Sequence, residues 1–239
     1  MNMRIIESIK NNIPNAVTCL NLLCGSLAVI VAFSPFDTMI WNLQGYQWAF
    51  VLIALAAVAD FCDGLVARLL HAVSPLGAEL DSLSDCVSFG LAPALILYNV
   101  MTAAGCDTWV CYMTLMIPIF GALRLARFNV DTNQTTTFTG LPIPANAIFW
   151  IGFIHFYVSH HSTSQWIVLA LIVLLSLLMV CNLRMFSLKI HGFGIKESYR
   201  QYILLFVSIL FIVLTGVTGL ACIIIFYVLM SIIFKEKEA

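Results

Sequence analysis

The chain has 239 residues, of which 62% are hydrophobic and only 10% are charged. An ordinary soluble domain carries roughly 25% charged residues, and a chain of this size cannot hide so much apolar surface from water. The composition therefore excludes a water-soluble globular fold and a disordered chain. The net charge of −1 offers no basic surface for nucleic acid. The sequence predicts an all-α integral membrane protein.

About eight apolar stretches are predicted to be transmembrane helices, since about 20 residues cross a bilayer. In chain order they cover residues 14–34, 46–70, 84–104, 108–128, 142–159, 165–186, 201–216 and 218–234. Residues 1–12 precede them and predict a short interfacial segment. Only residues 216–219 separate the last two stretches, so one long kinked helix is the alternative there. We expect one integral-membrane domain over residues 1–239.

The eleven lysine and arginine residues all fall on one side of this eight-span arrangement. The connections near 35–45, 104–107, 160–164 and 216–218 contain none of them. By the positive-inside rule, both termini and the basic loops face the cytoplasm, which places the protein in the cell (inner) membrane. The basic residues of 184–200 predict contact with anionic membrane lipid.

Acidic residues are concentrated in one short part of the chain. Five of the twelve lie within residues 60–85, and these are Asp60, Asp63, Glu79, Asp81 and Asp85. The i, i+3 spacing of Asp60 and Asp63 puts them on one helical face, and the i, i+4 spacing of Asp81 and Asp85 does the same at the start of the third span. Two neighbouring helices can thus aim four carboxylates at one point near the cytoplasmic surface.

Four clustered carboxylates in a membrane protein require compensation. An aspartate costs roughly 2.5–3.5 kcal/mol at the centre of a membrane helix, and Arg68 supplies a single positive charge. One or two divalent cations would balance the cluster, and an all-oxygen ligand set suits Mg²⁺ or Mn²⁺. Two metals bridged by carboxylates are a common device in phosphoryl chemistry.

Two other readings of the carboxylates stay open at this point. Single aspartates at helix ends are often caps or solvated surface residues. A cation-coupled transporter would also carry carboxylates in its membrane helices. Such a transporter is expected to show repeated segments with broken helices, and the sequence contains no second copy of the aspartate pattern.

The complete pattern is Asp60-x2-Asp63-Gly64-x2-Ala67-Arg68-x8-Gly77-x3-Asp81-x3-Asp85. It resembles the signature of the CDP-alcohol phosphatidyltransferases, with every fixed position present at the right spacing. The resemblance implies a membrane enzyme with two divalent metals, Mg²⁺ or Mn²⁺. Such an enzyme transfers a phosphatidyl group from a CDP-linked lipid to an alcohol and releases CMP. The resemblance also implies a homodimer. The positions of the basic residues place the aspartate pattern at the cytoplasmic surface, so the active site is expected to face the cytoplasm.

The resemblance carries roles to individual positions. It implies that the four aspartates ligate the metals and that Asp85 is also the general base. It implies a nucleotide-binding role for Gly64, Ala67, Arg68 and Gly77. The residues themselves agree, because small residues let a ligand approach a helix closely. Helix packing or a turn is the alternative explanation for the two glycines.

The acceptor is predicted from the wider chain, about residues 14–200. This part is similar to the family members that use L-serine, in the segments Pro14–Gly25, Asp85–Ala94, Arg124–Asn129 and Gly140–Asn146. We therefore expect CDP-diacylglycerol and L-serine as substrates and phosphatidylserine as product. Glycerol 3-phosphate or inositol phosphate is the alternative acceptor, and its phosphate would require a larger basic cluster near the site.

Three residues are candidate ligands of the acceptor. The carboxylate of serine would pair well with arginine, and the i, i+3 spacing of Arg124 and Arg127 puts both on one helical face. Topology anchoring or contact with lipid headgroups explains these arginines equally well. Ser88 is polar enough to touch the substrate, and a buried hydrogen bond between helices is its alternative role.

Overall fold

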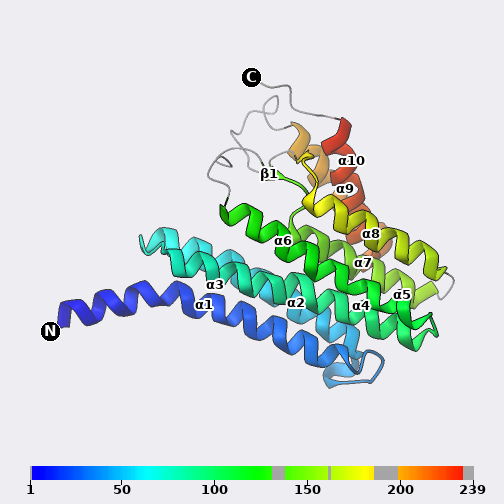
Figure 1. Cartoon of the computed structure of the whole chain (residues 1–239), viewed down its shortest axis with the longest axis horizontal. Coiled ribbons are helices and arrows are strands. Elements are labelled where there is room, and N and C mark those ends of the chain that lie inside the picture. Colours follow the sequence, from blue (N-terminus) through cyan, green and yellow to red (C-terminus); the bar gives the residue numbers. More distant parts are fainter. Residues whose placement is uncertain (1, 131–137, 161–162, 186–198, 234–239) are drawn as a thin grey trace. The chain divides into compact units, whose positions relative to one another are not determined.

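The computed structural model describes residues 2–130, 138–160, 163–185 and 199–233, with side chains from residue 12 onward except at 138, 139 and 184 (Figure 1). Most of the basic 184–200 segment and the last residues of the chain therefore lie outside the described residues. In chain order the elements are α1 (Asn2–Ala32), η1 (Ile40–Asn42), α2 (Gly45–Leu69), α3 (Pro75–Asp85), η2 (Cys86–Leu91), α4 (Ala92–Ala103), α5 (Thr108–Tyr112), η3 (Met113–Leu115), α6 (Met116–Val130), β1 (Phe138–Thr139), α7 (Ile143–His160), α8 (Gln165–Val180), β2 (Arg184–Met185), α9 (Tyr199–Thr215), η4 (Gly216–Thr218) and α10 (Gly219–Ile233).

The described part of the chain is almost entirely helical, which confirms the all-α prediction. Its two strands are two residues each, and β1 pairs with β2 in an antiparallel arrangement. Five helical segments are long and apolar enough to cross a membrane. They cover Asn12–Ala32, Gly45–Leu69, Pro75–Ala103, Thr108–Val130 and Tyr199–Ile233. The predicted count of eight spans is not confirmed.

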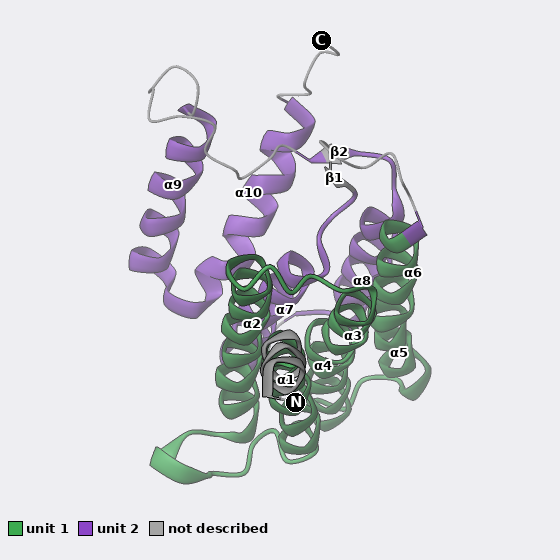
Figure 2. Ribbon diagram, turned by 90° about the vertical axis from the view of Figure 1, so that its left-hand side faces the viewer, with its two compact units in different colours: residues 1–129 green, residues 130–239 purple. Residues whose placement is uncertain are grey.

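The chain divides into two compact units, residues 1–129 and residues 130–239 (Figure 2). In the first unit, α1 packs along α2 and also contacts α3, η2 and α4. The helix α1 is continuous from Asn2 to Ala32, with Pro14 inside it. Residues 2–12 are therefore the first turns of a long helix, and their position at a membrane interface stays a prediction.

The third predicted span begins earlier than its hydropathy suggested. The prediction starts at residue 84, whereas α3 begins at Pro75 and continues through η2 and α4 to Ala103. Ser74 caps the helix by accepting a hydrogen bond from the Gly77 amide at 3.1 Å, and proline suits the first helical turn. Hydropathy missed the first turns of α3 because they are polar. Asp85 therefore lies inside a continuous helical run and not at its start.

The segment η2 is a π-helix that begins directly after Asp85. Its wider turns are rare and are found mostly as single bulges, often at functional sites. Ser88 lies in this segment and faces α1, where a Cβ added to Gly25 would collide with its backbone and hydroxyl. Glycine at position 25 is therefore needed for α1 to approach η2 this closely.

In the second unit, α7 packs against α10, and α10 also packs against α9. The chain reverses at η4, where Gly216 has a φ of +61° and a Cβ on Gly219 would lie 2.6 Å from the Phe211 carbonyl oxygen. Residues 199–233 thus form two helices side by side, as Figure 2 shows, and not one kinked helix.

The segment predicted as one span over 165–186 is helical only to Val180. Beyond it the chain becomes extended at Cys181, and β2 pairs with β1. The amide of Gly140 donates to the Leu183 carbonyl oxygen at 2.8 Å. Because residues 183–185 pair with the segment before α7, α8 ends at Val180 and not at residue 186, where the hydropathy predicted its end.

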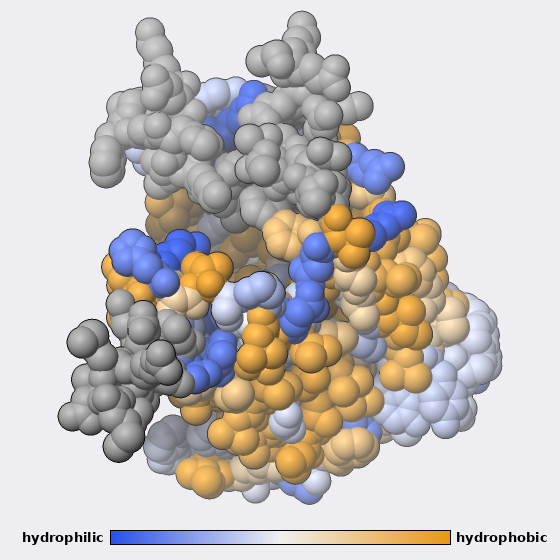
Figure 3. All heavy atoms as spheres, turned by 60° about the vertical axis from the view of Figure 1, so that its left-hand side comes forward, coloured by the Kyte–Doolittle hydropathy of each residue, from blue (hydrophilic) through white to orange (hydrophobic). Residues whose placement is uncertain are grey.

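The surface agrees with a membrane environment. None of the side chains of α9 is buried, and Phe206 and Val213 are 69% and 75% exposed. Large hydrophobic areas cover the face drawn in Figure 3. Exposed apolar surface on this scale is rare on soluble monomers, whereas helices with this surface are suited to lipid.

Candidate active site

The acidic cluster predicted from the sequence comes together at the ends of α2 and α3. Asp60, Asp63 and Asp81 each offer a carboxylate oxygen, and these oxygens all lie within 4.8 Å of one another. Asp63 is only 6% exposed, while Asp60 and Asp81 are half-buried. Helical spacing on α2 and close packing after the turn at Leu70–Ser74 produce this arrangement.

The cluster fits a hard divalent cation. Among the described residues, Asp63 Oδ2 and Asp81 Oδ1 are buried oxygens without a hydrogen-bond partner. Buried carboxylate oxygens normally have partners, and three carboxylates at this distance repel one another. Mg²⁺ and Mn²⁺ prefer oxygen ligands such as those of several carboxylates. A cation held by these three side chains would remove both the repulsion and the unsatisfied oxygens.

Asp85 is the fourth aspartate and lies apart from this group of three. It is 8% exposed, and its Oδ1 accepts a hydrogen bond from Asn21 Nδ2 on α1 at 3.3 Å. One turn of helix separates it from Asp81, so it still borders the cluster. The structure therefore gives Asp85 a partner that the other three carboxylates do not share.

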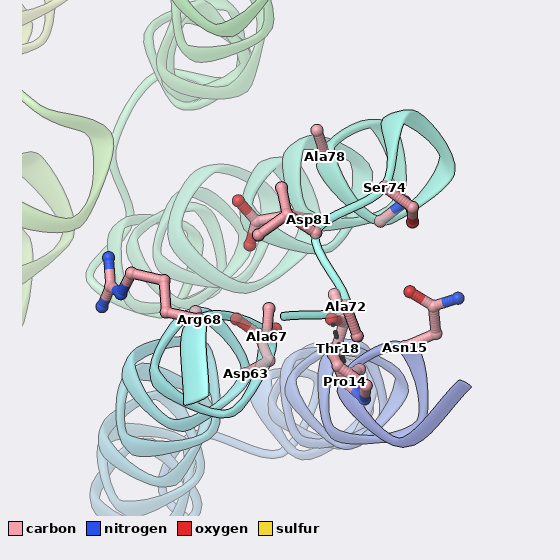
Figure 4. Close-up of a pocket in the computed structure, with 13 residues that line it drawn as sticks. Pro14, Asn15, Thr18, Asp63, Ala67, Arg68, Ala72, Ser74, Ala78 and Asp81 are labelled. Carbon is pink, nitrogen blue, oxygen red and sulfur yellow. Dashed lines mark hydrogen bonds between the residues drawn. The ribbon is translucent and has the colours of Figure 1, made fainter. Parts of the chain in front are cut away.

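A cavity of about 380 Å³ lies beside the cluster. Asp63 and Asp81 reach it from α2 and α3, and α1 lines the opposite wall (Figure 4). The lining residues are Pro14, Asn15, Thr18, Asp63, Gly64, Ala67, Arg68, Ala72, Val73, Ser74, Gly77, Ala78 and Asp81. All four residues predicted to bind the nucleotide are among them, and Arg68 is the only arginine or lysine of the lining.

The two glycines of the signature differ in their surroundings. A Cβ on Gly64 would meet only the end of the flexible Arg68 side chain, at 3.9 Å. Helix packing therefore does not require glycine there, and the space it leaves belongs to the cavity. A Cβ on Gly77 would lie 3.1 Å from Asn15 Oδ1 and 3.2 Å from Ser74 Oγ. Packing against α1 and the helix cap explains this second glycine at least in part.

The three acceptor candidates lie in the same compact unit as the aspartates, but none of them lines the cavity described above. Ser88 is fully buried, and its hydroxyl donates to the Asn21 carbonyl oxygen at 3.0 Å. Arg124 is half-buried and Arg127 is exposed on α6. The end of α6 is joined to α3, because Asn129 Nδ2 donates to Ser82 Oγ at 3.0 Å and to Glu79 Oε2 at 3.4 Å.

A family model described as CDP-alcohol phosphatidyltransferase matches residues 11–178. The chain belongs to the CDP-alcohol phosphatidyltransferase family. A CDP-diacylglycerol–serine O-phosphatidyltransferase of Helicobacter pylori is 33% identical over 207 residues, which cover 83% of this chain and 81% of that protein. The protein of the same name from Methanocaldococcus jannaschii is 37% identical over 172 residues, 72% of each chain. That from Bacillus subtilis is 37% identical over 135 residues, 56% of this chain and 70% of the relative.

The structure adds α1 to the site of this CDP-alcohol phosphatidyltransferase. Asn15 and Thr18 line the cavity, and Asn21 contacts Asp85. The signature over residues 60–85 does not include them, although their spacing of three residues places them along one side of a helix. That periodic polar pattern inside an apolar span was the available signal.

Proposed function

We propose that the chain transfers the phosphatidyl group of CDP-diacylglycerol to the hydroxyl of L-serine, giving phosphatidylserine and CMP. The observation that carries the proposal is the group of Asp60, Asp63 and Asp81 beside a cavity lined by the remaining signature residues. Relatives named for this reaction match most of the chain. Membership of the family sets the transporter alternative aside.

Asp60, Asp63, Asp81 and Asp85 are the proposed ligands of two divalent cations, Mg²⁺ or Mn²⁺. Bound there, the cations would neutralise the diphosphate of the CDP-lipid and the departing CMP. The distances within 4.8 Å and the unpartnered oxygens of Asp63 and Asp81 support three of these ligands directly. The position of Asp85 one turn from Asp81 supports the fourth.

Gly64, Ala67, Arg68 and Gly77 are the proposed nucleotide-binding residues. All four line the cavity next to Asp63 and Asp81. The open space at Gly64 allows a ligand to lie against α2, and Ala67 is small enough to permit the same approach. The guanidinium group of Arg68 offers donors and a positive charge to a phosphate.

Asp85 is the proposed general base. It would take the proton from the serine hydroxyl while the serine oxygen attacks the phosphorus that carries the diacylglycerol. The bond from that phosphorus to the CMP oxygen then breaks, and CMP leaves. Arg124, Arg127 and Ser88 are the proposed acceptor ligands, with the arginines facing the serine carboxylate. The hydrogen bonds of Asn129 hold the end of their helix beside α3 and so support the placement of the two arginines.

We also propose eight membrane spans in one integral-membrane domain. Four of them are the segments between Asn12 and Val130 that are long and apolar enough to cross a membrane. The other four are α7, α8, α9 and α10. The distribution of lysine and arginine supports cytoplasmic termini and an active site that faces the cytoplasm in the cell (inner) membrane. The family resemblance supports a homodimer.

The decisive experiment uses the purified full chain in lipid nanodiscs with CDP-diacylglycerol, Mn²⁺ or Mg²⁺, and a panel of alcohols. CMP release and the lipid product are both measured. Serine should give the fastest release, with phosphatidylserine as product. If CMP release is faster with glycerol 3-phosphate or inositol phosphate, that alcohol and not serine is the acceptor. Absence of CMP release with every alcohol would overturn the proposed function.

A further inference from the structure

Asn21 is a fully buried amide in the middle of an apolar helix. It is 0% exposed, and the segment Asn12–Ala32 is one of the candidate membrane spans. A buried amide group is costly unless it forms hydrogen bonds. The side chain donates from Nδ2 to Asp85 Oδ1 at 3.3 Å, across sixty-four positions of the sequence. Its one described side-chain partner is therefore the residue proposed as the general base.

The orientation of the amide follows from the chemistry of its partner. An ionised carboxylate only accepts hydrogen bonds, so the NH₂ end of Asn21 must face Asp85. The other end, Oδ1, is buried and has no hydrogen-bond partner among the described residues. A buried acceptor left unsatisfied costs about 1–3 kcal/mol. An apolar residue of similar size would avoid this cost but would leave the buried Asp85 Oδ1 without its donor, so the bond to Asp85 is what asparagine provides at this position.

Contacts on both sides of Asp85 hold Asn21 in place. Ser88 Oγ donates to the backbone carbonyl oxygen of Asn21 at 3.0 Å, and Ser84 Oγ lies 3.4 Å from the Thr18 carbonyl oxygen. Glycine at position 25 lets η2 lie directly against α1. The helix that carries Asp85 is thus joined to α1 just before and just after Asp85, which fixes the distance between Asn21 and the carboxylate.

We propose that Asn21 is a positioning residue that orients Asp85 toward the acceptor. Its hydrogen bond occupies Oδ1 and leaves Oδ2 available for the acceptor hydroxyl. An ionised carboxylate has further lone pairs, so this hydrogen bond is compatible with Asp85 as a metal ligand. Asn21 does not line the cavity beside the aspartates, so the proposed role acts through Asp85. The inference rests on the proposed function, because it requires Asp85 to act as the base.

The test compares variants of the full chain in nanodiscs. Asn21→Leu removes the donor at similar size, Asn21→Ala removes it at smaller size, and Asn21→Gln retains it. Ser26→Ala is the matched control, since the Ser26 hydroxyl bonds within α1 to the Leu22 carbonyl oxygen at 2.8 Å. Turnover, the KM values for both substrates, the thermal unfolding temperature and Mn²⁺ binding by electron paramagnetic resonance are measured.

We expect Asn21→Leu and Asn21→Ala to lower kcat by about 10- to 100-fold, a part of the roughly 10²–10⁴-fold that a positioned base supplies. Both KM values should stay within a factor of two, and Mn²⁺ binding should be retained. Asn21→Leu should unfold near the wild-type temperature, because removing the unsatisfied Oδ1 of Asn21 offsets the donor that Asp85 loses. Asn21→Gln should recover part of kcat, and Ser26→Ala should match the wild type.

Three results would overturn the inference: wild-type kcat in Asn21→Leu, a fall in kcat that tracks lost thermal stability, or loss of folding in both donor-free variants. The last two would show that Asn21 holds α1 to α3 structurally. If the wild type prefers another alcohol, only the serine assignment is overturned. The role of Asn21 is then tested by comparing kcat of the variants with that alcohol. If the wild type used no alcohol, the base role and the inference would fall together.

Discussion

Two glycines on membrane helices show how differently the two compact units use small residues. Gly64 on α2 faces the cavity, where an added Cβ would meet only the end of Arg68. Gly152 on α7 lies against α10, where an added Cβ would collide with the backbone and side chain of Ala221. At Gly64 the helices of the first unit leave space that polar groups surround, although Gly25 of the same unit packs closely against η2. At Gly152 the helices of the second unit are in direct contact.

Among the described residues, the clustered carboxylates lie in the first unit. The first unit holds four aspartates and the Asn21–Asp85 hydrogen bond within its helices. The helices α7 and α10 bury mainly apolar and aromatic side chains such as Trp150, Phe149 and Ile224. Burying charge without a partner is expensive, so a protein that keeps four carboxylates in one unit is expected to use them. The contrast predicts that chemistry resides in residues 1–129 and that α7–α10 contribute mainly packing.

Removal of divalent cations should have the largest effect. Excess EDTA should abolish CMP release, because a cluster of carboxylates repels an anionic diphosphate unless cations are bound there. Added Mn²⁺ or Mg²⁺ should restore the rate. The measurement is CMP release before and after restoration, with Ca²⁺ as a comparison ion. Full activity in EDTA would remove the metal from the proposal.

Asp85→Asn should lower turnover by roughly 10²–10⁴-fold, the usual contribution of a general base. The side chain keeps its size, so the protein should remain folded and should retain the cavity. CMP release gives the rate, and the thermal unfolding temperature gives the control. A rate near that of the wild type would reject Asp85 as base and as ligand.

Replacing Arg124 or Arg127 with alanine should raise the KM for serine by about 10-fold, equivalent to about 1.4 kcal/mol. The KM for CDP-diacylglycerol should change little, since neither arginine lines the cavity beside Asp63 and Asp81. Steady-state kinetics with each substrate varied in turn checks this. Equal changes in both values would indicate a role in membrane anchoring or folding and not a serine clamp.

The paired glycine variants should have the smallest effects and should differ in sign. Gly64→Ala should stabilise α2 by up to about 1 kcal/mol, because alanine favours helix and meets no neighbour, while it raises the KM for the CDP-lipid by intruding on the cavity. Gly152→Ala should lower the unfolding temperature, because Ala221 would have to move. The thermal unfolding temperature and the KM for the CDP-lipid, measured for both variants, test these two expectations. Destabilisation by Gly64→Ala would show that the space at α2 is needed for packing.

Much of the site could be predicted from residues 60–85 alone. Helical periodicity is local, so the spacing of Asp60 with Asp63 and of Asp81 with Asp85 places each pair on one face. The same reasoning could not include α1, because the contact between Asn21 and Asp85 joins residues far apart in the chain. It also could not separate Gly64 from Gly77, since the two glycines differ only in what lies opposite each helix.

Residue type alone leaves two roles open for Ser88, contact with the acceptor and a hydrogen bond between helices. A serine three residues after Asp85 is polar and close to the site, so contact with the acceptor is a reasonable expectation. In the structure its hydroxyl donates to the backbone of Asn21. Whether a side chain reaches substrate or a neighbouring helix depends on how the two helices are rotated and spaced. The π-helix after Asp85 sets part of that rotation, and no local pattern in the sequence predicted it.

The sequence by itself determined that this is a helical membrane protein with an acidic cluster at the ends of two consecutive helices. Apolar composition and residue spacing are sufficient for both conclusions, because lipid solvation and helical periodicity act locally. Tertiary structure decided which three carboxylates lie within 4.8 Å of one another and which one accepts a hydrogen bond from Asn21. It also decided that a Cβ on Gly64 would meet only the end of Arg68, whereas one on Gly77 would press against Asn15 and Ser74. Those features depend on how close α1, α2 and α3 approach, and that distance is set by packing across the whole unit.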